Sequence, residues 1–455
     1  QHWRVKMPLI LGTNSIKDTG YDVANSLRFN SGSSDNLSRS PSGASNRKTF
    51  TLSWWVKRSK LGSRQSIFNN TDGSGQDGVY FDFLADDTLL LADYGTGSWS
   101  SPKFETTQVF RDVSAWYHIV YAVDTTQSTE SNRVKIYVNG SQVTAFDTSD
   151  YPSQNADTLW NRSDTIYIGT YTAGGNYFGG YLAEVVNIDG SQLAPTDFGE
   201  FDSDSPTIWK PKNVSGLTFG TNGFYLDFEN SGSLGADVSG NSNNFTVNNL
   251  TSIDQSTDTC TNNAITFNPL DVTSDDEPTL SEGNLKAVAD GAFHQQRSTF
   301  YLTTGKWFWE FKPTTVGDAC QGGVVGSNYA GGSGLRRNYS YNGQKYTDGS
   351  SATYGATYTA NDIIGVALDL DNGTLIFYKN GATQGTAYTD MLSAIGQDGW
   401  TPDVIIYNST VEMNFGSPPY SISSGNSDGN GYGNFEYAVP SGYYALNTKN
   451  LSEFG

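Results

Sequence analysis

An alternation of apolar and polar residues with a period of two most constrains the fold of this chain. In the run 50–57, the apolar residues Phe50, Leu52 and Trp54 occupy every second position, and the run 306–311 repeats the pattern with aromatic residues. A period of two places alternate side chains on opposite faces of a half-buried β-strand. No window of about a dozen residues carries the 3.6-residue period of an amphipathic helix. The sequence therefore predicts an all-β protein.

Turn signals separate many runs of this kind. Asn139-Gly140 and Asn380-Gly381 each follow an apolar run, and this dipeptide is the strongest short signal for a β-hairpin. Glycine supplies 50 of 455 residues and aromatic residues 13%, which is typical of an ordered β protein with many turns. The other predicted strands are 26–30, 79–84, 88–92, 116–123, 134–138, 165–169, 181–188, 224–228, 245–247, 364–370, 375–378 and 403–415.

The two halves of the chain have a similar order of strands and turns. An aromatic strand at Trp54-Trp55 precedes the Asn139-Gly140 hairpin, and one at Trp307-Phe308 precedes the Asn380-Gly381 hairpin at a similar separation. Two β-sandwiches of related topology, one in each half, would give this pattern. Coincidence between two unrelated β domains would give it as well.

Charge and composition exclude several classes of function. The chain has 27 Lys and Arg against 47 Asp and Glu, a net charge of −20, so we expect no nucleic-acid partner. It has no run of about 18 apolar residues and no apolar signal-peptide core, so we expect no membrane insertion. The chain begins at Gln1, which indicates a trimmed, processed or incomplete sequence with Met7 as a candidate start. We expect Cys260 and Cys320 to be unlinked thiols.

Four segments of the first half carry a family resemblance. They are Leu52-Ser53-Trp54-Trp55-Val56, Trp116-Tyr117-His118-Ile119-Val120, Lys135-Ile136-Tyr137-Val138-Asn139-Gly140 and Gly180-Tyr181-Leu182-Ala183-Glu184-Val185. Together they resemble a laminin-G-like domain of the concanavalin A-like fold. In the second half, Trp307-Phe308-Trp309-Glu310, the run 362–369 and the run 375–381 resemble a SPRY domain, which has the same two-sheet sandwich.

The segments that link and close these domains are more specific. The runs 220–228, 237–241 and 268–270 resemble the connector of laminin-G/SPRY proteins of tailed bacteriophages, and Pro440 to Asn447 resembles their closing segment. The resemblance covers residues 20–455 and departs at 258–260, where such proteins tend to have Ser-Pro. It implies a virion-associated fibre or decoration protein, made in the host cytoplasm and carried on the virion surface.

These observations predict an all-β chain with two concanavalin A-like jelly-roll sandwiches. The expected parts are an N-terminal arm over 1–22, a laminin-G-like sandwich over 23–205, a connector with β-strands over 206–284 that could belong to the second sandwich, a SPRY-like sandwich over 285–420 and a closing segment over 421–455.

Catalytic motifs are weak in this sequence. Glucanases of the concanavalin A-like fold use carboxylates spaced Glu-x-Asp-x-x-Glu on one strand, and retaining hydrolysis needs two carboxyl groups about 5 Å apart. The nearest matches, 200–204, 227–229 and 369–371, lie at loops or turns, and His118 fits a packing role in an alternating strand. We therefore expect no catalytic residues and a non-enzymatic protein.

Calcium is the one cofactor that the composition supports as a candidate. The run 69–77 offers side-chain and backbone oxygens at a loop tip, with Asp72 and Asp77 as candidate ligands. Laminin-G domains often bind calcium at one edge of the sandwich. The whole chain is rich in Asn and Asp, so a chance cluster would look the same.

Glycan binding suits the composition best. Sugars offer hydroxyl groups and flat C–H faces, so their sites combine aromatic rings with Asn, Asp and backbone groups. Three predicted loops have this mixture, and the alternative for each aromatic residue is packing at the rim of a sandwich or in a subunit contact. The candidate residues are Asp93, Tyr94, Trp99, Tyr171, Asn176, Tyr177, Tyr339 and Tyr341.

The function predicted from the sequence is a phage structural protein, of a head or tail fibre or decoration type, that attaches to host-surface or environmental glycans. Its expected partners are such glycans, other virion proteins and further copies of itself in a homo-oligomer, with a trimer as a candidate. The alternative is a purely architectural virion protein whose sandwiches bind capsid or tail subunits. A polysaccharide depolymerase ranks third.

Overall fold

A computed structural model describes residues 20–73, 77–271, 277–326, 335–347, 349–394 and 399–455. The chain divides into two compact units, residues 19–261 and 262–455, which are considered separately below. Strands account for 44% of the chain and helices for 4%, so the predicted all-β class is confirmed. The one α-helix in the described ranges is α1 (Thr448–Phe454), and no helix there has the length and apolar character of a membrane span.

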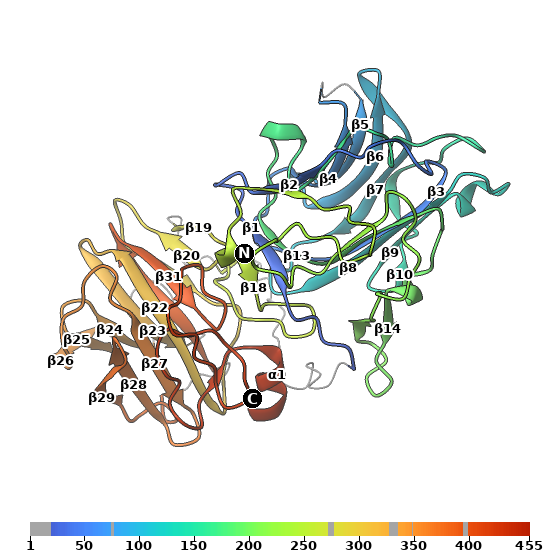
Figure 1. The fold of residues 1–455 in the computed structure, drawn as a ribbon. Coiled ribbons are helices and arrows are strands. Elements are labelled where there is room, and N and C mark those ends of the chain that lie inside the picture. Colours follow the sequence, from blue (N-terminus) through green and yellow to red (C-terminus); the bar gives the residue numbers. More distant parts are fainter. Residues whose placement is uncertain (1–19, 74–76, 272–276, 327–334, 348, 395–398) are drawn as a thin grey trace. The chain divides into compact units, whose positions relative to one another are not determined.

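The first unit is a sandwich of two large antiparallel sheets (Figure 1, blue to yellow-green). Sheet 1 has the order β10 (Ser141–Gln142), β9 (Val134–Val138), β8 (Trp116–Asp124), β3 (Thr49–Arg58), β13 (Gly180–Asp189), β1 (Ser26–Phe29) and β18 (Gln255–Ser256), with β16 (Phe224–Leu226) also paired to β13. Sheet 2 has the order β11 (Phe146–Asp150), β7 (Ser98–Val109), β6 (Thr88–Gly95), β5 (Gly78–Phe83), β4 (Gln65–Thr71), β12 (Thr165–Ile168), β2 (Asn36–Arg39) and β17 (Thr246–Asn248). A small ribbon of β14 (Gly199–Phe201) and β15 (Trp209–Pro211) and the 3₁₀ turns η2 (Glu130–Asn132), η3 (Thr172–Gly174), η4 (Pro195–Asp197) and η5 (Ser252–Asp254) complete this unit.

The core of the first sandwich lies between the two sheets. Leu52 and Trp54 of β3 face Phe68 and Phe81 of sheet 2, and all four side chains are buried in one cluster. The Trp54 and Phe68 rings meet edge to face with centroids 5.0 Å apart. The alternation in the run 50–57 therefore marks the inward face of β3, as predicted.

The opposite face of β3 is also buried, so the prediction that this strand is half-buried is wrong. Segments that follow β13 fold back over the outer face of sheet 1, where Trp55 and Trp209 pack in one cluster. The ammonium of Lys57 lies 2.8 Å from the carboxylate of Asp258, and the two side chains are 1% and 2% exposed. Trp116 donates its indole N–H to the same carboxylate at 3.1 Å. A third layer thus covers the outer face of β3 in sheet 1.

The second unit has the same plan (Figure 1, yellow to red). Sheet 3 has the order β19 (Thr279–Ser281), β20 (Lys286–Val288), β31 (Thr410–Asn414), β22 (Lys306–Thr315), β27 (Ile364–Asp369), β28 (Thr374–Lys379) and β29 (Ala382–Tyr388), with β32 (Tyr444–Ala445) parallel to β22. Sheet 4 has the order β21 (His294–Arg297), β30 (Trp400–Tyr407), β23 (Ala319–Gly326), β24 (Arg336–Ser340), β25 (Gln344–Thr347) and β26 (Ser350–Thr353).

The C-terminal segment covers the outer face of sheet 3. Phe308 of β22 packs against Phe435, with ring centroids 5.2 Å apart. The buried carboxylate of Glu310 accepts the backbone N–H groups of Glu436 and Tyr437 at 3.0 and 2.9 Å. Desolvation of this carboxylate raises the pKa of Glu310 to about 7. The closing segment is thus part of the second sandwich.

The region predicted as one connector, 206–284, is divided between the two units. β16 pairs with β13, β18 with β1 and β17 with β2, so the part up to residue 261 completes both sheets of the first sandwich. The remainder, with β19, belongs to the second sandwich. Strands of three residues or fewer carry too little alternation to indicate which sheet they join.

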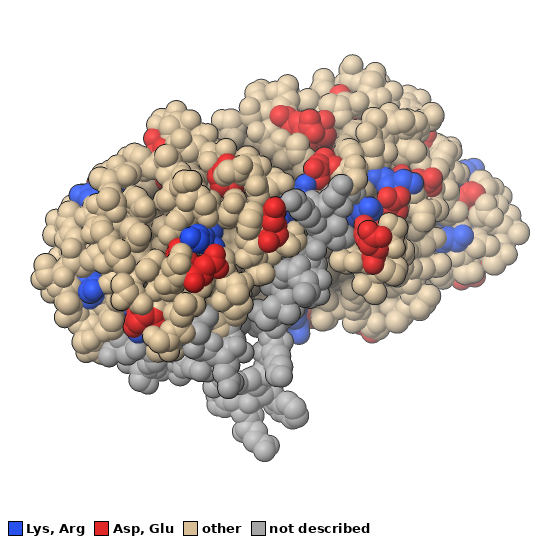
Figure 2. All heavy atoms as spheres, turned by 90° about the horizontal axis from the view of Figure 1, so that it is seen from below, with Lys and Arg blue, Asp and Glu red and all other residues tan. Residues whose placement is uncertain are grey.

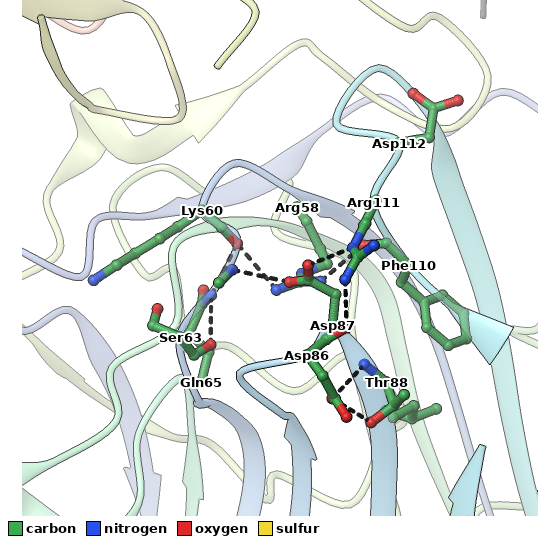
Figure 3. A network of polar contacts seen from close by, with 12 residues as sticks. Arg58, Lys60, Ser63, Gln65, Asp86, Asp87, Thr88, Phe110, Arg111 and Asp112 are labelled. Carbon is green, nitrogen blue, oxygen red and sulfur yellow. Dashed lines mark hydrogen bonds and ion pairs between the residues drawn. The ribbon is translucent and has the colours of Figure 1, made fainter. Parts of the chain in front are cut away.

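A buried ion pair fixes the β5–β6 turn to the end of β3 (Figure 3). Arg58 is fully buried, and its guanidinium lies 3.0 Å from the carboxylate of Asp87. It also donates to the carbonyl oxygens of Phe110 and Lys60 at 2.7 and 3.1 Å. Arg111, which is more exposed, pairs with the other oxygen of Asp87 at 2.9 Å.

Candidate functional site

The outer face of sheet 2 carries the strongest candidate site of the first sandwich. Phe81 of β5 pairs with Leu91 of β6, and both belong to the core. Because neighbours along a strand point to opposite faces, Tyr80 and its partner Ala92 lie on the outer face. Tyr94, two residues beyond Ala92, lies on the same face.

Four aromatic side chains gather on this face. The Tyr80 ring lies 5.7 Å from Tyr94 and 5.6 Å from Trp99, both edge to face, and 5.1 Å from Tyr171, nearly parallel. Tyr94 and Trp99 are themselves 5.1 Å apart. Tyr80 is 3% exposed and forms the floor, whereas Trp99 is 40% exposed. We call these four residues the aromatic surface.

Two cations lie over the aromatic surface. The Arg64 guanidinium is 5.7 Å from the ring centroids of both Tyr80 and Trp99, and the Lys103 ammonium is 5.6 Å from that of Trp99. These distances are within the range of cation–π attraction. Arg64 is held in place by Asp82, whose carboxylate accepts its Nε–H at 2.6 Å.

Polar groups of β4 and β5 lie beside the rings. Ser66 donates to the buried carboxylate of Asp82 at 2.6 Å. Desolvation raises the pKa of Asp82, and the Arg64 charge and the Ser66 hydroxyl oppose that effect. Asn69, which pairs with Tyr80, is fully buried and donates to the Val79 carbonyl at 2.7 Å. Its Oδ1 has no hydrogen-bond partner in the described part of the chain. The surface therefore combines flat rings and cations, with the buried polar groups of Ser66, Asn69 and Asp82 beside them.

Sequence reasoning found three of the four rings. The sequence predicts Tyr94 and Trp99 on one loop and Tyr171 on another, and the fold brings all three rings against Tyr80. Sequence reasoning missed Tyr80, Arg64 and Lys103. Tyr80 lies in a run with apolar residues at both odd and even positions, so the sequence does not show which face it occupies. Arg64 and Lys103 are distant in sequence from each other. The Gly-containing turn 95–97 was the sequence signal that the flanking residues form a hairpin, in which Tyr94 pairs with Trp99.

Asp93 does not belong to the aromatic surface, and its prediction as a sugar ligand is wrong. It pairs with Val79 on the core face, is 4% exposed and accepts the N–H of Leu159 at 2.8 Å. Desolvation raises its pKa to about 8. The carboxyl group therefore braces the loop at Leu159 from inside the sandwich.

Asn176 and Tyr177 lie on the same loop as Tyr171. Asn176 is exposed, and its backbone carbonyl accepts the N–H of Ser66 at 2.7 Å. Tyr177 is half-buried. These contacts hold the loop against β4, and a role of either side chain in binding stays a prediction.

The two candidates of the second sandwich, Tyr339 and Tyr341, differ in burial. Tyr339 is fully buried, in ring contact with Tyr354, Tyr358 and Phe377. Its prediction as a sugar contact is therefore wrong. Tyr341 packs against the same core and donates to the Asp318 carbonyl at 3.2 Å. The alternation Asn338, Tyr339, Ser340, Tyr341 would have identified a strand here.

The candidate calcium ligands are only partly described, because residues 74–76 lie outside the described ranges. The carboxylate of Asp77 lies 3.0 Å from the guanidinium of Arg162, which opposes a second cation at that oxygen. The backbone N–H of Asp72 donates to the Asp77 carbonyl at 3.4 Å. Within the described residues, no group of three or more His, Cys, Asp or Glu side chains is arranged to hold a metal ion.

The residues considered for catalysis have structural partners. Asp202 lies 3.1 Å from Lys210, and Asp369 lies 3.0 Å from Lys306. His118 is 1% exposed, accepts from the Trp209 indole at 2.9 Å through Nδ1 and contacts Ser53 at 2.8 Å through Nε2. Burial lowers the pKa of His118 to about 3, so it stays neutral in this packing role.

On the face drawn in Figure 2, most atoms belong to uncharged residues, and acidic and basic groups stand in small, separate clusters. This agrees with the low fraction of charged residues, 16%. Such a surface favours recognition by hydrogen bonds and ring contacts over attraction between large charged patches.

Comparisons with known proteins identify both domains. Residues 31–191 match the family model of the concanavalin A-like lectin/glucanases superfamily, of laminin-G type, and residues 306–418 match the SPRY domain model. The chain therefore contains a laminin-G-like sandwich followed by a SPRY domain, and the predicted pair of domain types is confirmed.

Individual relatives match only parts of the chain. An E3 ubiquitin-protein ligase of Arabidopsis thaliana is 25% identical over 135 residues, which are 28% of this chain and 10% of that protein. Ran-binding protein 10 of Danio rerio is 32% identical over 93 residues, which are 19% of this chain and 14% of that protein. Among solved structures, a candidate carbohydrate binding protein of Bacteroides ovatus is 16% identical to this chain with a TM-score of 0.36. The match covers 50% of this chain and 59% of the chain of that protein.

Proposed function

We propose that the first sandwich binds glycans on the aromatic surface and that the protein is non-enzymatic. The observation that carries this proposal is the 40% exposure of Trp99, which packs beside Tyr94 and shares the Tyr80 ring with Tyr171 on the outer face of sheet 2. Contiguous exposed apolar patches on a folded domain mark interaction sites. The flat C–H face of a sugar fits such rings, and Arg64, whose side chain is 35% exposed, supplies hydrogen-bond donors at their edge.

The wider role follows from the resemblance of the connector and closing segments to laminin-G/SPRY proteins of tailed bacteriophages. We propose a fibre or decoration protein on the virion surface that attaches the particle to host or environmental glycans. A shallow surface of this kind binds one sugar weakly, and many copies on a particle raise avidity by about 10²–10⁴. Oligomers of the chain would serve the same purpose.

Two alternatives use the same surface differently. In an architectural protein, the aromatic surface would bind another capsid or tail subunit. In a depolymerase, a pair of carboxylates would stand beside the bound sugar. On this face the Asp82 carboxylate is engaged by Arg64 and Ser66.

Tryptophan fluorescence gives a direct test. Of the nine tryptophans in the described ranges, Trp99 is the exposed one, and the other eight are 9% exposed or less. A glycan that stacks on Trp99 should therefore protect the exposed fraction of the emission from acrylamide quenching. A glycan array identifies the ligand, and Trp99→Ala should abolish both binding and protection while the melting temperature stays nearly unchanged.

Phe293→Ala is the matched control, because Phe293 is an exposed aromatic residue, at 63%, in the second sandwich. It should leave glycan binding intact. Binding that survives Trp99→Ala would refute the proposal. A Trp99→Ala protein that binds glycans normally but fails to join the particle would establish the architectural alternative, and release of sugar products from a polysaccharide would establish the enzymatic one.

A further inference from the structure

Two cations lie beside the exposed ring of the aromatic surface. Arg64 immediately precedes β4, and Lys103 lies in β7. Their charged groups are 5.7 and 5.6 Å from the centroid of the Trp99 ring. Trp99 is 40% exposed, so a ligand that contacts its ring comes within reach of both cations. The two cations differ in how their charge is compensated within the sandwich.

The charge of Arg64 is compensated by a buried carboxylate. Its Nε and Nη2 lie 2.6 and 2.5 Å from Oδ2 of Asp82, whose side chain is 0% exposed. The other oxygen of Asp82 accepts from Ser66 at 2.6 Å. The third nitrogen, Nη1 of Arg64, forms no hydrogen bond or ion pair with the residues that the structure describes. Asp82 therefore fixes the guanidinium beside the rings and leaves the N–H groups of Nη1 for a ligand.

The charge of Lys103 has no such partner. Two acidic residues share its face of sheet 2, since Asp150 is paired with it in register and Glu105 follows two positions later in β7. Within the described part of the chain, however, no carboxylate forms an ion pair with the Lys103 ammonium, which lies toward the Trp99 ring instead. The positive charge of Lys103 is therefore available beside the exposed ring.

These contacts favour an anionic ligand over a neutral one. A carboxylate or sulfate group accepts several hydrogen bonds at once and matches the N–H donors of a guanidinium. It would also compensate the charge of Lys103, whereas a neutral sugar would only replace the water around that ammonium with its own hydroxyl groups. The net charge of −20 repels anions at a distance, but salt at physiological strength screens that repulsion beyond about 8 Å. Contacts at the ring therefore decide the selectivity.

We propose that the aromatic surface selects acidic sugars, with an anionic substituent bound by the Lys103 ammonium and Nη1 of Arg64 while the sugar ring contacts Trp99. This selectivity rests on the proposed glycan-binding function and narrows its ligand to one class. A carboxylate and a sulfate ester share the required chemistry. Neutral sugars would contact the rings alone and bind more weakly.

A glycan array with the full chain gives the first test. The glycans whose binding is lost in Trp99→Ala should be acidic, with hexuronic and sialic acids testing the carboxylate and sulfated galactose chains testing the sulfate. Carboxyl reduction or desulfation of a bound glycan leaves its linkages intact and should weaken binding by about tenfold or more. Equal affinity for the neutral forms would overturn the selectivity and leave glycan binding at Trp99 standing. If Trp99→Ala changes the binding of no glycan, acidic or neutral, the proposed function itself fails, and the selectivity with it.

Substitution of Lys103 gives the second test, with an acidic glycan from the array as the probe. Lys103→Met removes the ammonium but keeps an unbranched side chain, so it should weaken binding by about threefold to tenfold and leave the melting temperature nearly unchanged. Lys103→Arg keeps the charge and should retain the affinity. Lys312→Met is the matched control, because it removes a cation that lies 4.7 Å from the Tyr420 ring centroid in the second sandwich. Binding that Lys103→Met leaves unchanged, or that Lys103→Arg weakens as much as Lys103→Met does, would refute the role of this charge.

Discussion

Asp87→Asn tests how much the buried ion pair between Arg58 and Asp87, shown in Figure 3, contributes to the stability of the first sandwich. Asn is close to isosteric with Asp, and its Oδ1 can still accept the N–H of Gly62, which Asp87 accepts at 3.0 Å. The backbone φ at this residue is +70°, a left-handed conformation that Asn also adopts readily. The substitution therefore removes the negative charge and also replaces the oxygen that accepts from Arg111 Nε at 2.9 Å with an NH2 donor.

The magnitude follows from the burial of Arg58. Its side chain is fully buried and that of Asp87 is 6% exposed, so the guanidinium would be left without a counter-charge in a region of low dielectric constant. Removing one partner of a buried pair costs about 3–5 kcal/mol. For a domain of about 150–250 residues, each kcal/mol lowers the melting temperature by about 2–4 °C. We expect Asp87→Asn to lower the melting temperature of the first sandwich by about 6–20 °C.

Calorimetry measures this change, and Arg111→Ala is its control. The Arg111 side chain is 56% exposed, and exposed ion pairs contribute about 0–1 kcal/mol. The control should therefore leave the transition nearly unchanged. If Asp87→Asn lowers the melting temperature no more than Arg111→Ala does, the buried pair does not hold the β5–β6 turn and the reasoning fails.

Three further predictions concern stability. The buried carboxyls of Asp93 and Glu310 have pKa values raised by desolvation to about 8 and about 7, from 3.8 and 4.5. The folded state then binds protons that the unfolded chain releases, so urea denaturation should give lower stability at about pH 8 than at about pH 5. Asp93→Asn should flatten that slope, and an unchanged slope would contradict the assignment. Leu52→Ala, at a fully buried position, should cost about 2–5 kcal/mol, whereas a neutral result would remove Leu52 from the core. Cys260 and Cys320 are free thiols in the structure, so reduction should change neither mass nor stability.

The sequence predicted the strands in which apolar residues occupy every second position. In such strands the alternate apolar residues Leu52, Trp54, Ile136, Val138, Trp307, Val366 and Leu368 are all buried. The Asn-Gly dipeptides marked the hairpins β9–β10 and β28–β29, because a tight turn of this type is set by local backbone conformation.

The candidate site depended on pairing that the sequence does not encode locally. Leu89, Leu90 and Leu91 are three consecutive apolar residues, so both faces of β6 are apolar in this run. The sequence of β6 therefore does not indicate whether Asp93 or its neighbour Tyr94 faces the core. The covering layer of Trp55 and Trp209, which buries β3 on both faces, likewise comes from residues more than 150 positions apart.

The sequence by itself determined the class and the local elements: period-two strands, tight turns, an all-β chain and two domains of recognisable type. The tertiary structure decided which faces stay open. It turned Asp93 inward, buried Tyr339, gathered Tyr80, Tyr94, Trp99 and Tyr171 on sheet 2, and divided the region 206–284 between the sandwiches. The physical reason is that alternation fixes which side chains share a face of a strand, whereas long-range packing of sheets and covering segments fixes which of those faces water reaches.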